Sequence, residues 1–66
     1  MKADSIEISR DEQHNRWLIR IKIGEEVIRR HSNESKNADQ DTLRTAAAKT
    51  ALDEGYTIDP SDIVFA

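Results

Sequence analysis

The segment from Arg16 to Ile23 alternates its side chains without a break, and this feature constrains the fold more than any other in the sequence. Side chains that recur at every second residue share one face of a β-strand. The two faces are Trp17, Ile19, Ile21 and Ile23 on one side, and Arg16, Leu18, Arg20 and Lys22 on the other. A strand rich in isoleucine is therefore expected here, with its isoleucine face toward the core.

Two further strands are expected on either side of this segment. Residues 5–9 alternate in the same way, and the polar residues 10–15 predict a loop between the two strands. Gly24 and Glu25 predict a type II′ hairpin, because glycine accepts the positive φ of the first central position. The third strand is then expected to begin at Glu26 and to end at Arg30 or His31.

The lengths of the two connections also predict how the strands pair, since a turn fixes the register of its hairpin. The expected pairs are Ile21–Ile28 and Arg20–Arg29 across the second turn, and Ile8–Trp17 and Ile6–Ile19 across the first loop.

A single helix is expected over residues 39–54, preceded by a polar surface loop. An apolar stripe recurs at helical spacing through Leu43, Ala46, Ala47, Thr50 and Ala51. Asn37 or Asp39 can cap the N-terminus of this helix, and Gly55 is the residue expected just beyond its C-terminus. Because the stripe is mostly alanine, the helix can lie close to the isoleucine face of the sheet.

The C-terminal residues are expected to complete the core. Residues 59–62 predict a type I turn, because Pro60 occupies its favoured second position. The apolar residues around this turn are expected to close the open side of the core, as short strands or as an extended clasp: Tyr56, Ile58, Ile63 and Phe65. Residues 1–66 are thus predicted to form one α+β domain. Its three-stranded antiparallel sheet is followed by one helix packed on one face and by a short C-terminal strand or clasp, in the order β-β-β-α-β.

The composition limits the classes to which the protein can belong. The chain of 66 residues has no cysteine, which excludes a disulfide framework and a cysteine-based zinc site. Its net charge of −3 lacks the overall positive field typical of nucleic-acid-binding proteins. Since no apolar run is long enough for a membrane span or a signal peptide, a cytoplasmic protein with no membrane partner is expected.

The sequence shows no constellation of catalytic residues. The two glycines, Gly24 and Gly55, form no phosphate-binding loop, and a nucleophile elbow is absent. His14 lies in the polar loop and His31 at the end of a strand, and a metal site would need a third ligand beside them. Two solvent-exposed histidines are the preferred interpretation. We therefore expect no enzyme activity, no metal and no cofactor.

The outer face of the sheet, on the side opposite the helix, is the first candidate binding surface. We define the outer face by the side chains of Arg16, Leu18, Arg20, Lys22, Val27 and Arg29. Its basic side chains suit phosphate or an acidic protein, but ordinary solubilising charge balanced by Glu7 is the preferred interpretation. Leu18 and Val27 form an exposed apolar pair, which favours a protein contact over phosphate.

The sheet edges are a second candidate surface, because an edge strand presents unpaired backbone groups. Arg29 and Arg30 are expected to protect the edge formed by the third strand. The first strand is expected to form the other edge, or to pair with a second copy in a homodimer.

Residues 14–52 resemble part of a double-stranded-RNA-binding domain. His14 followed by Arg16 and Trp17 is similar to that family's first hairpin, and Gly24 sits where its second turn often has glycine. Residues 47–52 (AAKTAL) are similar to the alanine-rich motif of its final helix. The resemblance implies three antiparallel strands followed by a helix, and RNA as a partner.

The sequence departs from the double-stranded-RNA-binding pattern at two places. No counterpart of that family's first helix, which contacts the minor groove, precedes Ser5. The family's phosphate-binding lysine cluster aligns with Gln40 and Asp41, and only Arg44 remains basic there. The resemblance therefore implies the order of the elements more than the RNA contacts.

The chain is also similar to small bacterial proteins of the YegP type. These have a strand, a second strand that starts with Arg-Trp, a glycine turn, a third strand and a helix; the matching residues here are Arg16 to Leu18 and Gly24 to Ile28. This resemblance implies a fold rather than an activity. The expected function is a small non-catalytic interaction module that binds a protein partner or itself, and the alternative is weak nucleic-acid binding through the outer face.

Overall fold

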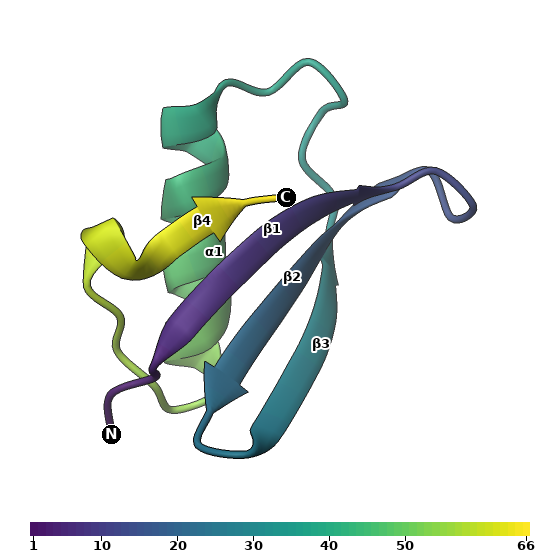
Figure 1. The fold of residues 1–66 in the computed structure, drawn as a ribbon. Helices are drawn as coiled ribbons and strands as arrows, with labels where there is room; N and C mark the ends of the chain where they lie inside the picture. Colours follow the sequence, from purple (N-terminus) through teal and green to yellow (C-terminus); the bar gives the residue numbers. More distant parts are fainter.

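The computed structural model describes all residues from 1 to 66 and contains the expected elements in the expected order (Figure 1). They are β1 (Ser5–Asp11), β2 (Arg16–Ile23), β3 (Glu26–Ser32), α1 (Gln40–Asp53), the 3₁₀ turn η1 (Pro60–Asp62) and β4 (Ile63–Phe65). The four strands form one sheet in the order β3-β2-β1-β4, in which only β4 runs parallel to its neighbour. The predicted α+β fold is therefore confirmed. The length and apolarity that a membrane-crossing helix needs are not found in any helix of the protein.

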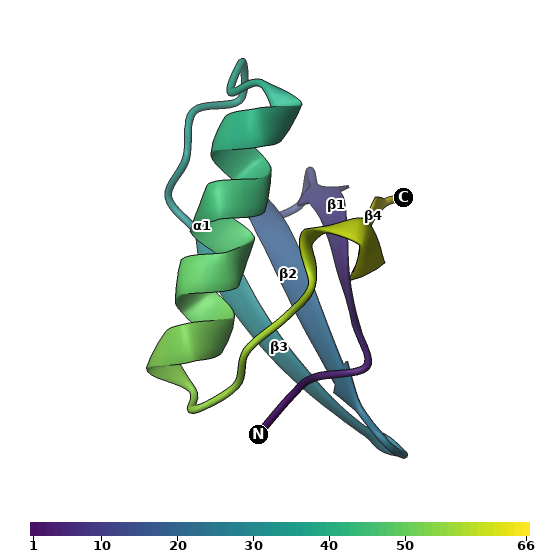
Figure 2. The same cartoon turned by 90° about the vertical axis from the view of Figure 1, so that its left-hand side faces the viewer.

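The core lies between α1 and one face of the sheet, as Figure 2 shows from the side. Nine residues are buried, and all are apolar: Ala3, Ile6, Ile8, Ile19, Ile21, Leu43, Ala47, Ala51 and Ile63. The three that come from α1 belong to the predicted apolar stripe. Two of these three are alanines, so the helix approaches the strands closely while isoleucines supply the bulk of the core.

The pairing of β1 with β2 differs from the prediction by two residues. Ile8 lies opposite Ile19 and Ile6 opposite Ile21, not opposite Trp17 and Ile19 as expected. Strand β1 continues as far as Asp11, so the connection to β2 is shorter than the predicted loop of residues 10–15. A shift of two residues leaves every side chain on its predicted face, which is why the alternation alone could not reveal it.

The pairing of β2 with β3 agrees with the prediction. Ile21 lies opposite Ile28 and Arg20 opposite Arg29. Gly24 has a φ of 59°, while Asn15 is the only non-glycine residue with a positive φ. A positive φ at the first central position alone is the sign pattern of a type II′ turn. The Gly24 amide also donates a hydrogen bond to Asp4 Oδ2 at 2.7 Å, which ties the turn to the start of the chain.

Residues predicted from the sequence cap the N-terminus of α1 and follow its C-terminus. Asp39, rather than Asn37, is the N-cap residue, and its carboxylate accepts a hydrogen bond from the Thr42 amide at 2.8 Å. This bond satisfies one of the amide groups that the first turn of a helix leaves unpaired. Gly55 follows the helix with a φ of 91°, a conformation that glycine adopts without strain.

The C-terminal residues join the sheet, and this changes which strands form its edges. Ile63 pairs with Ile6 as β4 runs alongside β1. The predicted turn over residues 59–62 precedes β4 as η1, and the Asp62 amide donates to the Asp59 carbonyl at 2.8 Å. The expectation that the first strand is an edge is therefore wrong, because β4 covers it. The edges are β3 and β4. The half-buried Tyr56, Ile58 and Phe65 pack against the core as predicted.

Candidate functional site

The structure brings the six predicted residues of the outer face together on two adjacent strands. Arg16, Leu18, Arg20 and Lys22 come from β2, and Val27 and Arg29 come from β3. The register places Arg20 directly opposite Arg29 and Lys22 opposite Val27. Since α1 packs on the isoleucine face, the outer face is left without a covering element (Figure 2).

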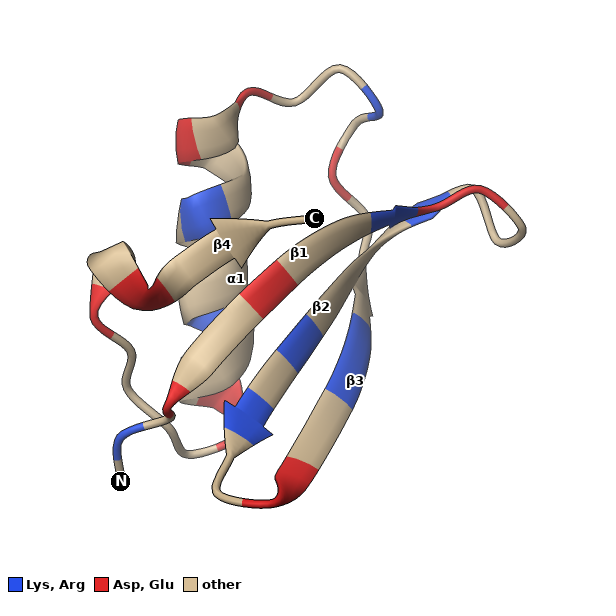
Figure 3. Ribbon diagram, viewed as in Figure 1, with Lys and Arg blue, Asp and Glu red and all other residues tan.

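The basic side chains of the outer face are only partly neutralised. Arg20 forms an ion pair with Glu7 of β1, with 2.9 Å between Nη1 and Oε1. Arg16, Lys22 and Arg29 have no carboxylate oxygen within 4.0 Å. Like charges directly opposite each other destabilise a sheet, and Arg20 faces Arg29 in this way. The outer face therefore carries positive charge that an external anionic group could neutralise, and Figure 3 shows it on β2 and β3.

Apolar side chains lie among these charges. Val27 is 43% exposed, and Val64, from the edge strand β4, is 50% exposed. Leu18 is half-buried and lies opposite His31, whereas Val27 lies opposite Lys22, so the two do not form the exposed apolar pair that was predicted. The sequence prediction did not include Val64, because its place beside β1 depends on the tertiary pairing. A shallow hollow of about 310 Å³ on this side of the sheet is lined by Ser5, Glu7, Arg20, Lys22, Val27 and Val64.

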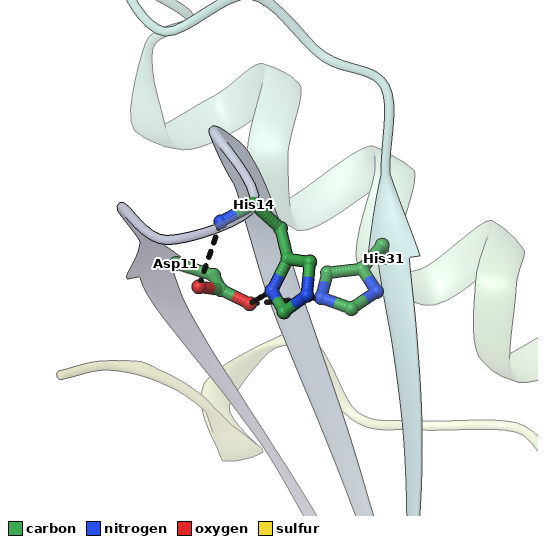
Figure 4. A group of neighbouring side chains, drawn as sticks. All are labelled: Asp11, His14 and His31. Carbon is green, nitrogen blue, oxygen red and sulfur yellow. Dashed lines mark hydrogen bonds and ion pairs between the residues drawn. The ribbon is translucent and has the colours of Figure 1, made fainter.

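A second group of polar side chains meets at the far end of the same sheet. Asp11 ends β1, His14 lies in the β1–β2 connection, and His31 is near the end of β3. The Oδ2 atom of Asp11 lies 2.8 Å from Nδ1 of His14 and 3.0 Å from Nε2 of His31 (Figure 4). The two imidazole rings are tilted by 48° with centroids 5.4 Å apart. We call Asp11, His14 and His31 the histidine cluster.

The electrostatics of the histidine cluster follow from these contacts. Hydrogen bonds from the rings of His31 and His14 stabilise the ionised carboxylate and lower the pKa of Asp11 from 3.8 to about 2. The backbone amide of His14 also donates to Oδ1 of Asp11 at 3.3 Å, which orients the carboxylate. Asp11 is therefore an anionic group held between two imidazoles at neutral pH.

Sequence reasoning did not find this cluster. It placed Asp11 in the polar loop and treated His14 and His31 as two separate exposed side chains. In the structure the two histidines are exposed, as expected, but they share the carboxylate of Asp11. The spacing Asp11-x-x-His14 across a turn was the available signal for one contact. His31 is brought to Asp11 only by the pairing of β2 with both of its neighbours.

Comparisons with known proteins add no relative of this chain. No protein-family model, no curated protein and no solved structure matches it.

Proposed function

We propose that the protein is a small non-catalytic interaction module that binds an acidic protein surface through the outer face of its sheet. The observation that supports this most directly is the set of unpaired cations, Arg16, Lys22 and Arg29, on a sheet face that no other element covers. The protein as a whole carries a net charge of −3, so this concentration of positive charge runs against its overall balance.

The side chains between the charges favour a protein over a nucleic acid. Leu18, Val27 and Val64 lie at three separate places around the ion pair of Arg20 with Glu7, so the outer face alternates apolar and charged contacts. Protein surfaces offer both kinds of contact. Single-stranded nucleic acids are bound largely by stacking their bases on aromatic rings. Trp17 and Phe65 instead pack against the core, so they are not available on the outer face. A partner whose surface carries carboxylates interspersed with apolar side chains is the best complement.

Self-association is the second candidate, and it would use an edge of the sheet rather than the outer face. Two outer faces laid against each other would bring the unpaired cations of both copies together. Strand β3 pairs with β2 on one side only, so its free backbone groups can pair with a second chain. Arg29 and Arg30 lie on this strand, and Arg30 is held on the helix side by an ion pair with Glu54.

An NMR titration of the ¹⁵N-labelled protein tests these alternatives. We expect a synthetic peptide rich in glutamate and leucine to shift the amide resonances of Leu18, Lys22, Val27 and Arg29. Lys22→Gln should weaken this binding, whereas Lys49→Gln, which makes the same charge change on the exposed surface of α1, should leave it unaltered.

Three other results would assign the surface differently. A short RNA duplex that shifts the same residues more strongly than the peptide, with steep loss on adding salt, would favour nucleic-acid binding. Shifts on β3 that appear only with rising protein concentration would favour self-association. Absence of shifts on the outer face with either ligand would overturn the proposal.

A further inference from the structure

The histidine cluster concentrates metal-ligating groups in one place. The chain has two histidines in all, and both contact the same carboxylate oxygen. The three ligand atoms come from three separate segments of the chain and lie within 4.8 Å of one another. Neutral imidazole nitrogen and carboxylate oxygen are common ligands of divalent first-row transition metals.

We propose that Asp11, His14 and His31 form a binding site for a divalent transition-metal ion, of which Zn²⁺ is the one to test first. The ligand atoms would be one carboxylate oxygen of Asp11, Nδ1 of His14 and Nε2 of His31. The inference depends on this geometry and is independent of the function proposed for the outer face.

The distances are close to those that a metal would require. Zinc binds imidazole nitrogen and carboxylate oxygen at about 2.0–2.2 Å in tetrahedral geometry, so its ligand atoms lie roughly 3.3 Å apart. In the cluster the Oδ2 atom of Asp11 is 2.8 Å from the His14 nitrogen and 3.0 Å from the His31 nitrogen. The two histidine nitrogens lie within 4.8 Å of each other. An opening of a few tenths of an ångström at both Asp11 contacts, with these two nitrogens brought to about the same spacing, would admit the ion.

The proton positions are also compatible with coordination. Without a metal, each ring nitrogen that faces Asp11 acts as a hydrogen-bond donor to it. A neutral histidine can carry its proton on either ring nitrogen. On metal binding the proton of His14 would reside on Nε2 and that of His31 on Nδ1, which leaves both facing lone pairs for the ion. The positive ion then takes the place of the two N–H donors beside the carboxylate.

The backbone positions two of the three ligands before any ion binds. Asp11 and His31 are on strands of one sheet, opposite Arg16 and Leu18 of β2 respectively. Ligands on regular elements are held more firmly than ligands on loops, which lowers the cost of assembling a site. The third ligand, His14, is restrained by its own amide, which donates to Asp11.

The site is open toward solvent. The side chains of His14 and His31 are 59% and 35% exposed, and that of Asp11 is 20% exposed. Three protein ligands leave a fourth tetrahedral position, which water or a group from another molecule can fill. The arrangement therefore resembles open metal sites rather than closed structural ones.

Calorimetric titration of the tag-free, chelator-treated protein with zinc chloride is the first test. We expect saturable binding of one Zn²⁺ per chain. Asp11→Asn replaces the anionic ligand oxygen by a neutral amide oxygen, and His31→Ala removes a ligand nitrogen, so each should weaken binding about tenfold or more. Glu12→Gln serves as the matched control, because it removes a neighbouring carboxylate outside the cluster and should bind Zn²⁺ like the parent. Circular dichroism confirms that each variant is folded.

NMR of the parent protein keeps the proposal testable even if a variant fails to fold. Zinc should shift the ring nitrogen resonances of His14 and His31 together, with saturation at the same ratio as the calorimetry. The proposal is overturned by the absence of saturable binding, by shifts at only one histidine, or by one ion bound per two chains. Equal affinity in Asp11→Asn and the parent would also overturn it.

Discussion

The indole Nε1 of Trp17 donates a hydrogen bond to the backbone carbonyl of Ser35 at 2.9 Å, so a residue of β2 holds the segment that leads into α1. The Trp17 ring also contacts Arg10 of β1, whose guanidinium carbon lies 5.3 Å from the ring centroid. Trp17 is half-buried and packs against the core. It thus joins β1, β2 and the β3–α1 connection at one point.

Replacement of Trp17 by Ala is therefore expected to lower the free energy of unfolding by about 3 kcal/mol, through lost packing and a lost loop attachment. Urea denaturation followed by circular dichroism measures the change. Trp17→Phe, which keeps a ring but loses the hydrogen bond to Ser35, should have a free energy of unfolding between those of the parent and Trp17→Ala. Parent-like melting of Trp17→Ala would show that this side chain does not carry the packing assigned to it.

The ion pair of Arg20 with Glu7 offsets the repulsion between Arg20 and Arg29. Glu7→Gln should therefore destabilise the sheet by less than about 1 kcal/mol, as is usual for an exposed pair. Adding Arg29→Gln to the Glu7→Gln variant should recover part of the lost unfolding free energy. Arg29→Gln alone should change the unfolding free energy little. A double-mutant cycle by urea denaturation measures this coupling, and simple additivity of the two changes would contradict it.

Adjacent residues of β4 should respond very differently to truncation. Ile63 is 5% exposed and lies opposite Ile6, whereas Val64 is 50% exposed on the other side of the sheet. Ile63→Ala is expected to cost about 2–4 kcal/mol of unfolding free energy. Val64→Ala should stay within about 0.5 kcal/mol of the parent. Thermal or urea denaturation compares them, and equal effects would mean that β4 does not dock as described.

Stability should fall at acid pH through carboxylates whose pKa is lowered by folding. Hydrogen bonds from Thr42 lower the pKa of Asp39, and those from Ser61 lower the pKa of Asp59. The pKa of Asp11 falls to about 2, chiefly through His31. A lowered native pKa contributes stability at pH above the ordinary value of 3.8, and this contribution is lost as the pH falls toward the native pKa.

The helix cap allows this acid dependence to be tested at one residue. Asn accepts the same capping hydrogen bond without a titrating charge, so Asp39→Asn should retain α1 and lose part of the decline below pH 3.8. Asp53→Asn, at the other end of the helix, is the matched control and should keep the parent's acid profile. Denaturation midpoints measured across this pH range compare the three proteins. An unchanged profile in Asp39→Asn would argue against the role of the cap.

The success of the sequence prediction follows from local physical causes. Alternation in residues 16–23 determines which side chains share a face, whatever the pairing. Gly24 specifies the second turn because few other residues accept its positive φ, and the alanine-rich stripe before Gly55 determines the buried side of the helix. The shared face of Arg16, Arg20 and Lys22 follows from the same period of two.

Tertiary structure decided the features that depend on contacts distant in sequence. Whether Ile8 would meet Trp17 or Ile19 could not be told from alternation, since both pairings bury the same faces. The pairing of β4 with β1 determined the edges of the sheet and brought Val64 to the outer side. The faces were thus determined by the sequence itself, because they arise from the periodicity of a single strand. The pairings and the histidine cluster were decided by the folded sheet, because each arises from segments that only the fold brings together.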